Sequence, residues 1–252
     1  MIDVAQNALL LGAAMVGGAI NSVAGGGSFF TFPALVVGGL APIAANATST
    51  VALWPGSLAS TWAYRKDVNG LREHLAGLTC VSLAGGLLGA LLLLWTRNET
   101  FARIVPWLLL TATSLFAISG RAVAFLRARN RGVLHPAVLL TGQFVIAVYG
   151  GYFGGGMGIL MLATYALAGL SDIHAMNGLK SLLGAAINAA AVVTFLVAGI
   201  VQWRPALLMV AGSLVGGYFG ARLAKKVDAG RVRQFVIATG AVMTVKFFLS
   251  QA

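Results

Sequence analysis

Long stretches without a charged residue alternate along the chain with short basic clusters. Residues 4–64 and 132–171 contain no Asp, Glu, Lys or Arg. Shorter charge-free runs occupy 74–96, 104–120, 181–203 and 205–221. Because about 20 apolar residues cross the hydrocarbon core of a bilayer as a helix, this pattern predicts membrane-spanning helices. Six simple spans are expected near 44–64, 72–96, 103–123, 174–200, 204–224 and 231–250.

Two apolar stretches, 8–40 and 134–170, are longer than one span and too short for two. Each contains three consecutive glycines near its middle, at 25–27 and at 154–156. A glycine inside a helix costs about 1 kcal/mol relative to alanine, so a glycine triplet favours a break. We therefore expect each stretch to form two short helices that enter and leave the membrane on the same side.

The composition agrees with a membrane protein and excludes several other classes. Hydrophobic residues make up 59% of the 252 residues and charged residues 9%, against about 25% charged in soluble domains. These values exclude a soluble enzyme, a disordered tail and a nucleic-acid-binding domain. The net charge of +11 is therefore interpreted as basic loops on a cytoplasmic face. The single cysteine, Cys80, and the lack of metal-ligand spacing predict neither a metal site nor a cofactor.

The two halves of the chain are similar at a nearly constant offset. Ser-Leu-Ala-Gly-Gly-Leu-Leu-Gly-Ala at 82–90 matches Ser-Leu-Val-Gly-Gly-Tyr-Phe-Gly-Ala at 213–221, an offset of 131. Asn46 corresponds to Asn177 at the same offset, and the glycine triplets correspond at 129. Chance similarity between glycine-rich helices is the alternative. The predicted division is a first repeat, a basic cytoplasmic linker and a second repeat, at 1–126, 127–133 and 134–252.

The positions of the basic residues favour repeats of inverted topology. If each glycine-broken stretch counts as a there-and-back pair, each half has five segments, and the second half is inverted. Twelve Lys and Arg residues, in 65–72, 121–131 and 222–233, then lie on one side of the membrane. Four lie on the other: Arg97, Arg103, Arg204 and Lys246. The positive-inside rule assigns the larger group to the cytoplasm and both termini to the periplasm.

The predicted fold is an all-α polytopic membrane protein made of two inverted repeats. Each repeat consists of a glycine-broken helical hairpin and three spanning helices. This gives eight long helices, or ten segments if each broken helix counts as a pair. Inverted repeats with broken helices near the midplane are a recurring architecture of secondary transporters.

The glycine breaks are candidate anion sites. Free backbone N–H groups at a helix start, together with the helix dipole, favour a negative charge. Ser28 either caps the helix that follows or adds its hydroxyl to the site. The alternative is that the glycines only allow helices to pack closely.

A polar stripe occurs once in each half of the chain. Two sets of four residues, each on one helix face, correspond at an offset of 131: Asn46, Ser49, Thr50 and Ser57 match Asn177, Lys180, Ser181 and Asn188. Polar contacts between helices are one explanation for such a stripe. An ionised residue inside a membrane segment, however, is a functional candidate by default.

Lys180 is the cation that lies well inside an apolar stretch. It is a candidate to compensate the charge of a bound anion. Two alternatives are an interfacial position near the helix start and an ion pair with Asp172, which is itself predicted to be a helix N-cap. The six acids fall in loops or at helix ends, so no carboxylate is expected at mid-membrane.

The glycine motifs resemble those of the sulfite exporter TauE/SafE family, also called the toluene sulfonate uptake permease family. The matching stretches are 24–35 (Ala-Gly-Gly-Gly-Ser-Phe-Phe-Thr-Phe-Pro-Ala-Leu), 46–50 (Asn-Ala-Thr-Ser-Thr) and 150–160 (Gly-Gly-Tyr-Phe-Gly-Gly-Gly-Met-Gly-Ile-Leu). The resemblance implies transport of sulfur-containing anions across a bacterial cytoplasmic membrane, often outward. The second repeat departs from the first, because Leu162 replaces Pro33 and Leu179-Lys180 replaces Thr48-Ser49, so we expect an asymmetric site.

The stripes, the breaks and the resemblance together define a candidate substrate site between the two breaks. Its predicted residues are Gly25, Gly26, Gly27, Ser28, Asn46, Thr48, Ser49, Thr50, Gly154, Gly155, Gly156, Asn177, Lys180 and Ser181. The expected partners are a small anionic substrate and membrane lipids, with a homodimer as an option and no nucleic acid.

The function predicted from the sequence is secondary transport of sulfite, sulfoacetate or related organosulfonates by alternating access, with export as the expected direction. An anion channel that uses the same pore is the first alternative. A membrane enzyme acting on a lipid phosphate is the second. Such an enzyme would need an intramembrane base or nucleophile, whereas His74, His135 and His174 fall at predicted loops.

The charge pattern generates a topology prediction. Reporter fusions within 121–133 and within 222–233 should both report the cytoplasm, and fusions at either terminus should report the periplasm. Placement of the two basic segments on opposite faces would contradict the inverted arrangement.

Overall fold

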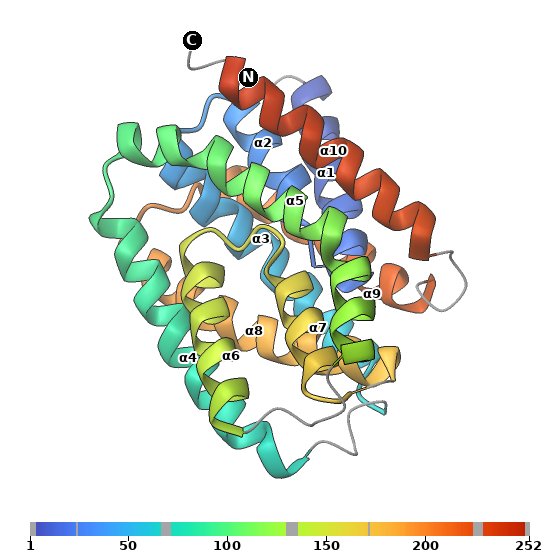
Figure 1. Ribbon diagram of the computed structural model, residues 1–252. Coiled ribbons are helices and arrows are strands. Elements are labelled where there is room, and N and C mark those ends of the chain that lie inside the picture. The colour runs from blue at the N-terminus through green and yellow to red at the C-terminus, as the bar shows by residue number, and fades with distance from the viewer. Residues whose placement is uncertain are drawn as a thin grey trace.

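The computed structural model describes residues 4–23, 25–66, 72–129, 136–170, 172–223 and 229–249, and all regular structure in these residues is helical (Figure 1). The ten helices are α1 (Val4–Val23), α2 (Ser28–Val37), α3 (Pro42–Ala63), α4 (Arg72–Trp95), α5 (Asn98–Arg129), α6 (Pro136–Tyr152), α7 (Met157–Leu167), α8 (Ile173–Val197), α9 (Trp203–Leu223) and α10 (Ala229–Leu249). Among them α1, α4 and α8 contain apolar segments long enough to cross a membrane, namely Val4–Ser22, Leu75–Trp95 and Ile173–Val197.

The charge-free pattern located most of the helices well. Five of the six predicted spans match α3, α4, α8, α9 and α10 with ends that differ by about three residues or fewer. The span predicted at 103–123 is too short, because α5 runs from Asn98 to Arg129. A charge ends the apolar segment but not the helix, since Arg and Lys are good helix formers.

Both glycine-broken stretches form helical hairpins, as predicted, but one arm of each hairpin is long. Helix α1 has 20 residues and α2 has 10, whereas α6 has 17 and α7 has 11. The expectation of two short helices is therefore wrong for α1, because its uncharged Gln6 and Asn7 are part of the helix. Of the predicted linker 127–133, residues 127–129 belong to α5, and the remainder lies outside the described residues.

Helices distant in sequence pack against each other closely. Helix α1 packs on α9, and α6 packs on α4. Helices α3 and α8 contact each other, and α3 also packs on α9 while α8 packs on α4. Glycines line these contacts: Gly217 of α9 meets the backbone of Gly56 in α3, and Gly86 of α4 meets the backbone of Ile187 in α8. Without side chains at these positions, the helix backbones approach to van der Waals distance.

An aromatic cluster forms the core on one side of the helix breaks. Phe32, Phe101 and Phe153 are fully buried and come from α2, α5 and the turn between α6 and α7. Phe32 stacks on Phe247 of α10 with ring centroids 5.6 Å apart. In Figure 1 the start of α1 and the end of α10 lie at the same end of the molecule. Because Phe247 lies near the end of α10, the cluster lies toward that end.

The close packing of α4 on α6 generates a prediction about Gly89. A Cβ on Gly89 would clash with the backbone of Val148 and Tyr152, whereas a Cβ on Gly77 in the same helix would meet only the Leu140 side chain at 3.4 Å. We expect Gly89→Ala to lower the free energy of unfolding by about 1–3 kcal/mol. Gly77→Ala should be neutral or stabilising by up to about 1 kcal/mol. Unfolding by dodecyl sulfate in mixed micelles measures both; equal effects would contradict the packing described.

Candidate functional site

The two helix breaks depend on glycine backbone conformations. Gly25, Gly154 and Gly156 have φ angles of 79°, 77° and 78°, a left-handed region that other residues enter at a cost. Gly156 is the N-cap of α7, and Gly27 is the N-cap of α2. The predicted breaks at 25–27 and 154–156 are therefore confirmed as interruptions of the helices.

The two breaks touch each other at the centre of the molecule. A Cβ built on Gly25 would lie 2.5 Å from the Cα of Gly158, at the start of α7. On the other side, a Cβ on Gly154 would lie 3.9 Å from the Ser28 Oγ, at the start of α2. The N-terminal ends of α2 and α7 are thus brought together. Several of their first N–H groups donate to carbonyls of the breaks, for example Phe29 to Gly26 and Met157 to Gly154.

Side chains from the long helices α3 and α8 bind the carbonyl groups where the long arms end. The Lys180 Nζ donates to the Ser22 carbonyl oxygen of α1 at 3.0 Å. The Asn46 Nδ2 donates to the Tyr152 carbonyl oxygen of α6 at 3.1 Å. Each hairpin therefore receives a hydrogen bond from the polar stripe of the other half of the chain.

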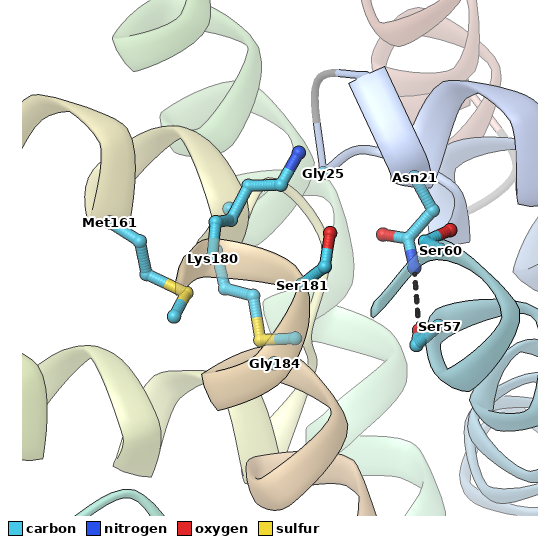
Figure 2. A pocket seen from close by; sticks show the side chains of 10 residues that line it. Asn21, Gly25, Ser57, Ser60, Met161, Lys180, Ser181 and Gly184 are labelled. Atoms are coloured by element: carbon cyan, nitrogen blue, oxygen red, sulfur yellow. Dashed lines mark hydrogen bonds between the residues drawn. The ribbon is translucent and has the colours of Figure 1, made fainter. Parts of the chain in front are cut away.

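A small polar cavity lies beside the contact between the breaks (Figure 2). Its volume is about 20 Å³, room for about one water molecule. The residues that line it are Asn21, Gly25, Ser57, Ser60, Met157, Gly158, Met161, Lys180, Ser181 and Gly184. Figure 2 shows the Lys180 side chain extending toward the Gly25 turn and the Ser181 hydroxyl pointing into the same space.

Lys180 is buried in this site without an acidic partner among the described side chains. Only 3% of the residue is exposed, and its Nζ donates to the Ser22 carbonyl and to Asn177 Oδ1 at 2.9 Å. Asp172 instead accepts from the His174 backbone N–H at 2.9 Å as the N-cap of α8. This confirms Asp172 as the cap. These contacts exclude the ion pair with Asp172, and the burial shows that the Lys180 side chain points into the protein.

The Ser181 hydroxyl has no hydrogen-bond partner among the described residues. Its residue is 6% exposed, and its Oγ is a buried atom without a protein partner. The Asn46 Oδ1 is also buried and unpaired. Because a buried polar atom without a partner costs roughly 1–3 kcal/mol, an unpaired hydroxyl in a cavity indicates a place for water or a ligand.

Three other predicted site residues bond to protein atoms and do not line the cavity. The Ser49 Oγ lies 2.6 Å from the Thr31 Oγ1, and the Thr48 Oγ1 accepts from the Gln202 backbone N–H at 3.1 Å. The Thr50 hydroxyl donates to the carbonyl of Asn46. The first polar stripe therefore consists mainly of helix contacts, and this agrees with the predicted asymmetry between the halves.

The remaining glycines and Ser28 build the breaks. Gly27 packs against the backbone of Gly17, and the Gly155 carbonyl accepts from the Tyr149 hydroxyl at 2.5 Å. Gly26 is buried, and its carbonyl accepts from the Phe29 N–H at 3.1 Å. Ser28 begins α2 without capping it, because Gly27 is the N-cap and no side-chain cap hydrogen bond is present.

Sequence reasoning left several cavity residues out of the site. Asn21 is the most informative of them: its Nδ2 donates to the Ser57 Oγ at 3.0 Å. An amide four residues before a glycine triplet, inside a charge-free stretch, was a usable signal. Ser60, Met157 and Met161 gave none, since small and apolar residues at these spacings are typical of any membrane helix.

A second cavity, of about 430 Å³, lies between the start of α1, the end of α2 and the start of α9. Its walls include Gln6, Leu35, Trp203 and Arg204, and it shares no lining residue with the inner cavity.

Comparison with known proteins gives a consistent result over nearly the whole chain. The family model described as "Sulfite exporter TauE/SafE" matches residues 10–247. "Probable membrane transporter protein YfcA" of Escherichia coli K12 is 30% identical over 94% of this chain and 89% of that protein. "Probable membrane transporter protein ORF9" of Sinorhizobium sp is 31% identical over 95% of this chain and 91% of that protein. No solved structure matches.

The contact between the breaks generates a prediction with a matched control. Gly25 and Gly39 both have positive φ, at 79° and 90°, but a Cβ on Gly39 has no atom within 4 Å. Alanine at either position carries the same backbone cost, about 1–2 kcal/mol, and only Gly25→Ala also pushes against the Gly158 backbone. Gly25→Ala should lower the melting temperature in detergent by roughly 5 °C more than Gly39→Ala. Indistinguishable melting temperatures would show that the breaks do not depend on this contact.

Proposed function

The chain belongs to the sulfite exporter TauE/SafE family of membrane transporters, and from its central site we propose that it carries small sulfur-containing anions across the cytoplasmic membrane. The proposed substrates are sulfite, sulfoacetate and related organosulfonates, and the proposed direction is export. The observation that carries the proposal is Lys180, a buried cation in a polar cavity, whose direct partners are the neutral Ser22 carbonyl and the Asn177 amide. An anion supplies the charge that this site lacks.

The elements around the cavity favour an oxyanion as ligand. The Lys180 ammonium has three N–H groups, of which two are used in hydrogen bonds to protein atoms. The unpaired Ser181 hydroxyl provides another donor. The starts of α2 and α7 add partial positive charge from their helix dipoles. Sulfonate and sulfite oxygens accept from donors of all three kinds.

The contacts between helices support a pair of inverted repeats. The most extensive contacts in one half have counterparts in the other: α1 on α9 corresponds to α6 on α4, and α3 on α9 corresponds to α8 on α4. In detail, Gly216 meets the carbonyl of Met15, and Gly85 meets the carbonyl of Phe144. These pairs correspond at offsets of 131 and 129, the values found in the sequence. We propose that rocking of one repeat against the other alternates access to the site.

The cavities support a carrier over a channel. The inner cavity holds about 20 Å³, too little for a sulfite ion, and the larger cavity is separate, with no lining residue in common. A carrier closes around its site in this way and opens to one side at a time, whereas a channel needs a continuous pore. Exchange of labelled for unlabelled sulfite in proteoliposomes, faster than net efflux, would distinguish a carrier from a channel. Membership of a transporter family excludes the lipid-phosphate enzyme.

Removal of the Lys180 charge tests the proposed function. Lys180→Met keeps the length and the apolar bulk of the side chain, so it should weaken sulfite binding at least about tenfold, which corresponds to roughly 1.4 kcal/mol. Lys180→Arg should keep part of the binding because the charge remains while the geometry changes. Lys246→Met, at an exposed position of α10, is the control and should behave as wild type. If Lys180→Met binds and transports sulfite like the wild type, Lys180 does not bind the anion, and its role is to hydrogen-bond the Ser22 carbonyl.

A further inference from the structure

The inner cavity contains one side chain that can carry a full positive charge, Lys180. Lys180 is the titratable residue among those that line it, and the other lining residues are neutral: Asn21, Gly25, Ser57, Ser60, Met157, Gly158, Met161, Ser181 and Gly184. The corresponding position in the first repeat is Ser49, whose hydroxyl pairs with Thr31. The site is thus asymmetric in charge, because the first repeat supplies no second cation.

This charge is not needed to hold the helix end that it contacts. The Tyr152 carbonyl, which ends the long arm of the second hairpin, is bound by the neutral amide of Asn46 at 3.1 Å. Ser22 ends the long arm of the first hairpin and receives the Lys180 ammonium at nearly the same distance, 3.0 Å. Because the neutral Asn46 amide is sufficient to bind the end of α6, binding the end of α1 does not require the charge of Lys180. That charge is therefore available to a ligand.

The charge of the ligand follows from the single ionisable group at the cavity. A monovalent anion beside Lys180 makes the buried site neutral. A divalent anion leaves one negative charge without a counter-ion in a low-dielectric interior, where an uncompensated buried charge is strongly destabilising. Hydroxyl groups and helix dipoles carry only partial charges and neutralise it incompletely.

We infer that this site selects oxyanions by charge: it binds the monovalent ions bisulfite and monosulfonates and rejects the divalent ions sulfite and sulfate. Of the substrates proposed above, this excludes sulfoacetate, which carries a carboxylate beside its sulfonate and is divalent at neutral pH. The inference rests on the proposed function and adds the protonation state of the substrate.

The other titratable groups described on the helices packed against α8 do not line the cavity. Tyr165 of α7 is buried and donates to Gln143, Tyr149 of α6 donates to the Gly155 carbonyl, and Tyr152 pairs with Thr96 at 3.3 Å. Cys80 of α4 is exposed. Helix α1 and helix α3 carry no charged side chain within their bounds. Of the described side chains, Lys180 alone therefore responds to pH at the cavity.

The test compares two ligands with the same SO₃ head across the ionisation that converts bisulfite to sulfite near neutral pH. Methanesulfonate has a methyl group in place of the hydroxyl and stays monovalent throughout. Binding of each to the purified wild-type protein is measured by calorimetry as the pH is raised. Loss of the Lys180 proton would weaken both ligands equally, so the ratio of their affinities isolates the charge of the ligand.

We compare the affinity for bisulfite and sulfite taken together with the affinity for methanesulfonate. At pH values above the ionisation of bisulfite, this ratio should fall by about tenfold per pH unit. Sulfate should fail to compete with methanesulfonate at any pH. A constant ratio, or sulfate that competes as well as methanesulfonate, would overturn charge selection while leaving anion transport intact. Absence of binding by both ligands at every pH would overturn the proposed function itself, and this inference with it.

A variant that adds a charge provides an independent test. Asn21→Lys replaces a half-buried amide that lines the cavity with a second ammonium. It should flatten the pH dependence of the sulfite-to-methanesulfonate ratio and allow sulfate to compete. Gln234→Lys makes the same change at an exposed position of α10 and should keep the wild-type ratio. A folded Asn21→Lys protein that still rejects sulfate would contradict the inference; if the variant does not fold, the wild-type comparison decides.

Discussion

A helix that ends inside a membrane leaves carbonyl and N–H groups that hydrocarbon cannot satisfy, and the rest of this structure follows from how those groups are satisfied. The ends of α1 and α6 receive hydrogen bonds from Lys180 and Asn46. These side chains come from α8 and α3, two helices that contact each other. The starts of α2 and α7 meet beside them, through Gly25 and Gly158. Satisfying the broken backbone therefore concentrates donors at one place.

The asymmetry of the donors gives the site its chemistry. Asn46 and Lys180 bind equivalent helix ends, but only Lys180 brings a full charge, and it faces a cavity beside the unpaired Ser181 hydroxyl. On the other side, Ser49 pairs with Thr31 and contributes to the contact between α2 and α3. Both halves line the cavity, but its ionisable side chain comes from the second half alone. This asymmetry agrees with a carrier that moves one anion at a time.

Much of the fold could be predicted from the sequence, because burying a charge in a bilayer is so costly that charge-free stretches mark the spans. The same reasoning found the breaks and Lys180, but it misjudged the length of α5, since a helix continues beyond the membrane where charges are tolerated. Periodicity shows which face of a helix is polar, but not which helix it meets. For that reason Thr48 was assigned to the site although it binds Gln202, and Asn21 was left out although it lines the cavity.

The position of a bound anion tests most directly whether Lys180 holds the substrate. Selenite has the pyramidal shape of sulfite, and its selenium atom is located by anomalous scattering in crystals of the protein. We expect a selenium peak within hydrogen-bonding reach of Lys180 and Ser181, between the starts of α2 and α7. A peak confined to the cavity beside Arg204, or selenite bound with none near Lys180, would contradict the central claim that the buried lysine at the two helix breaks holds the anion.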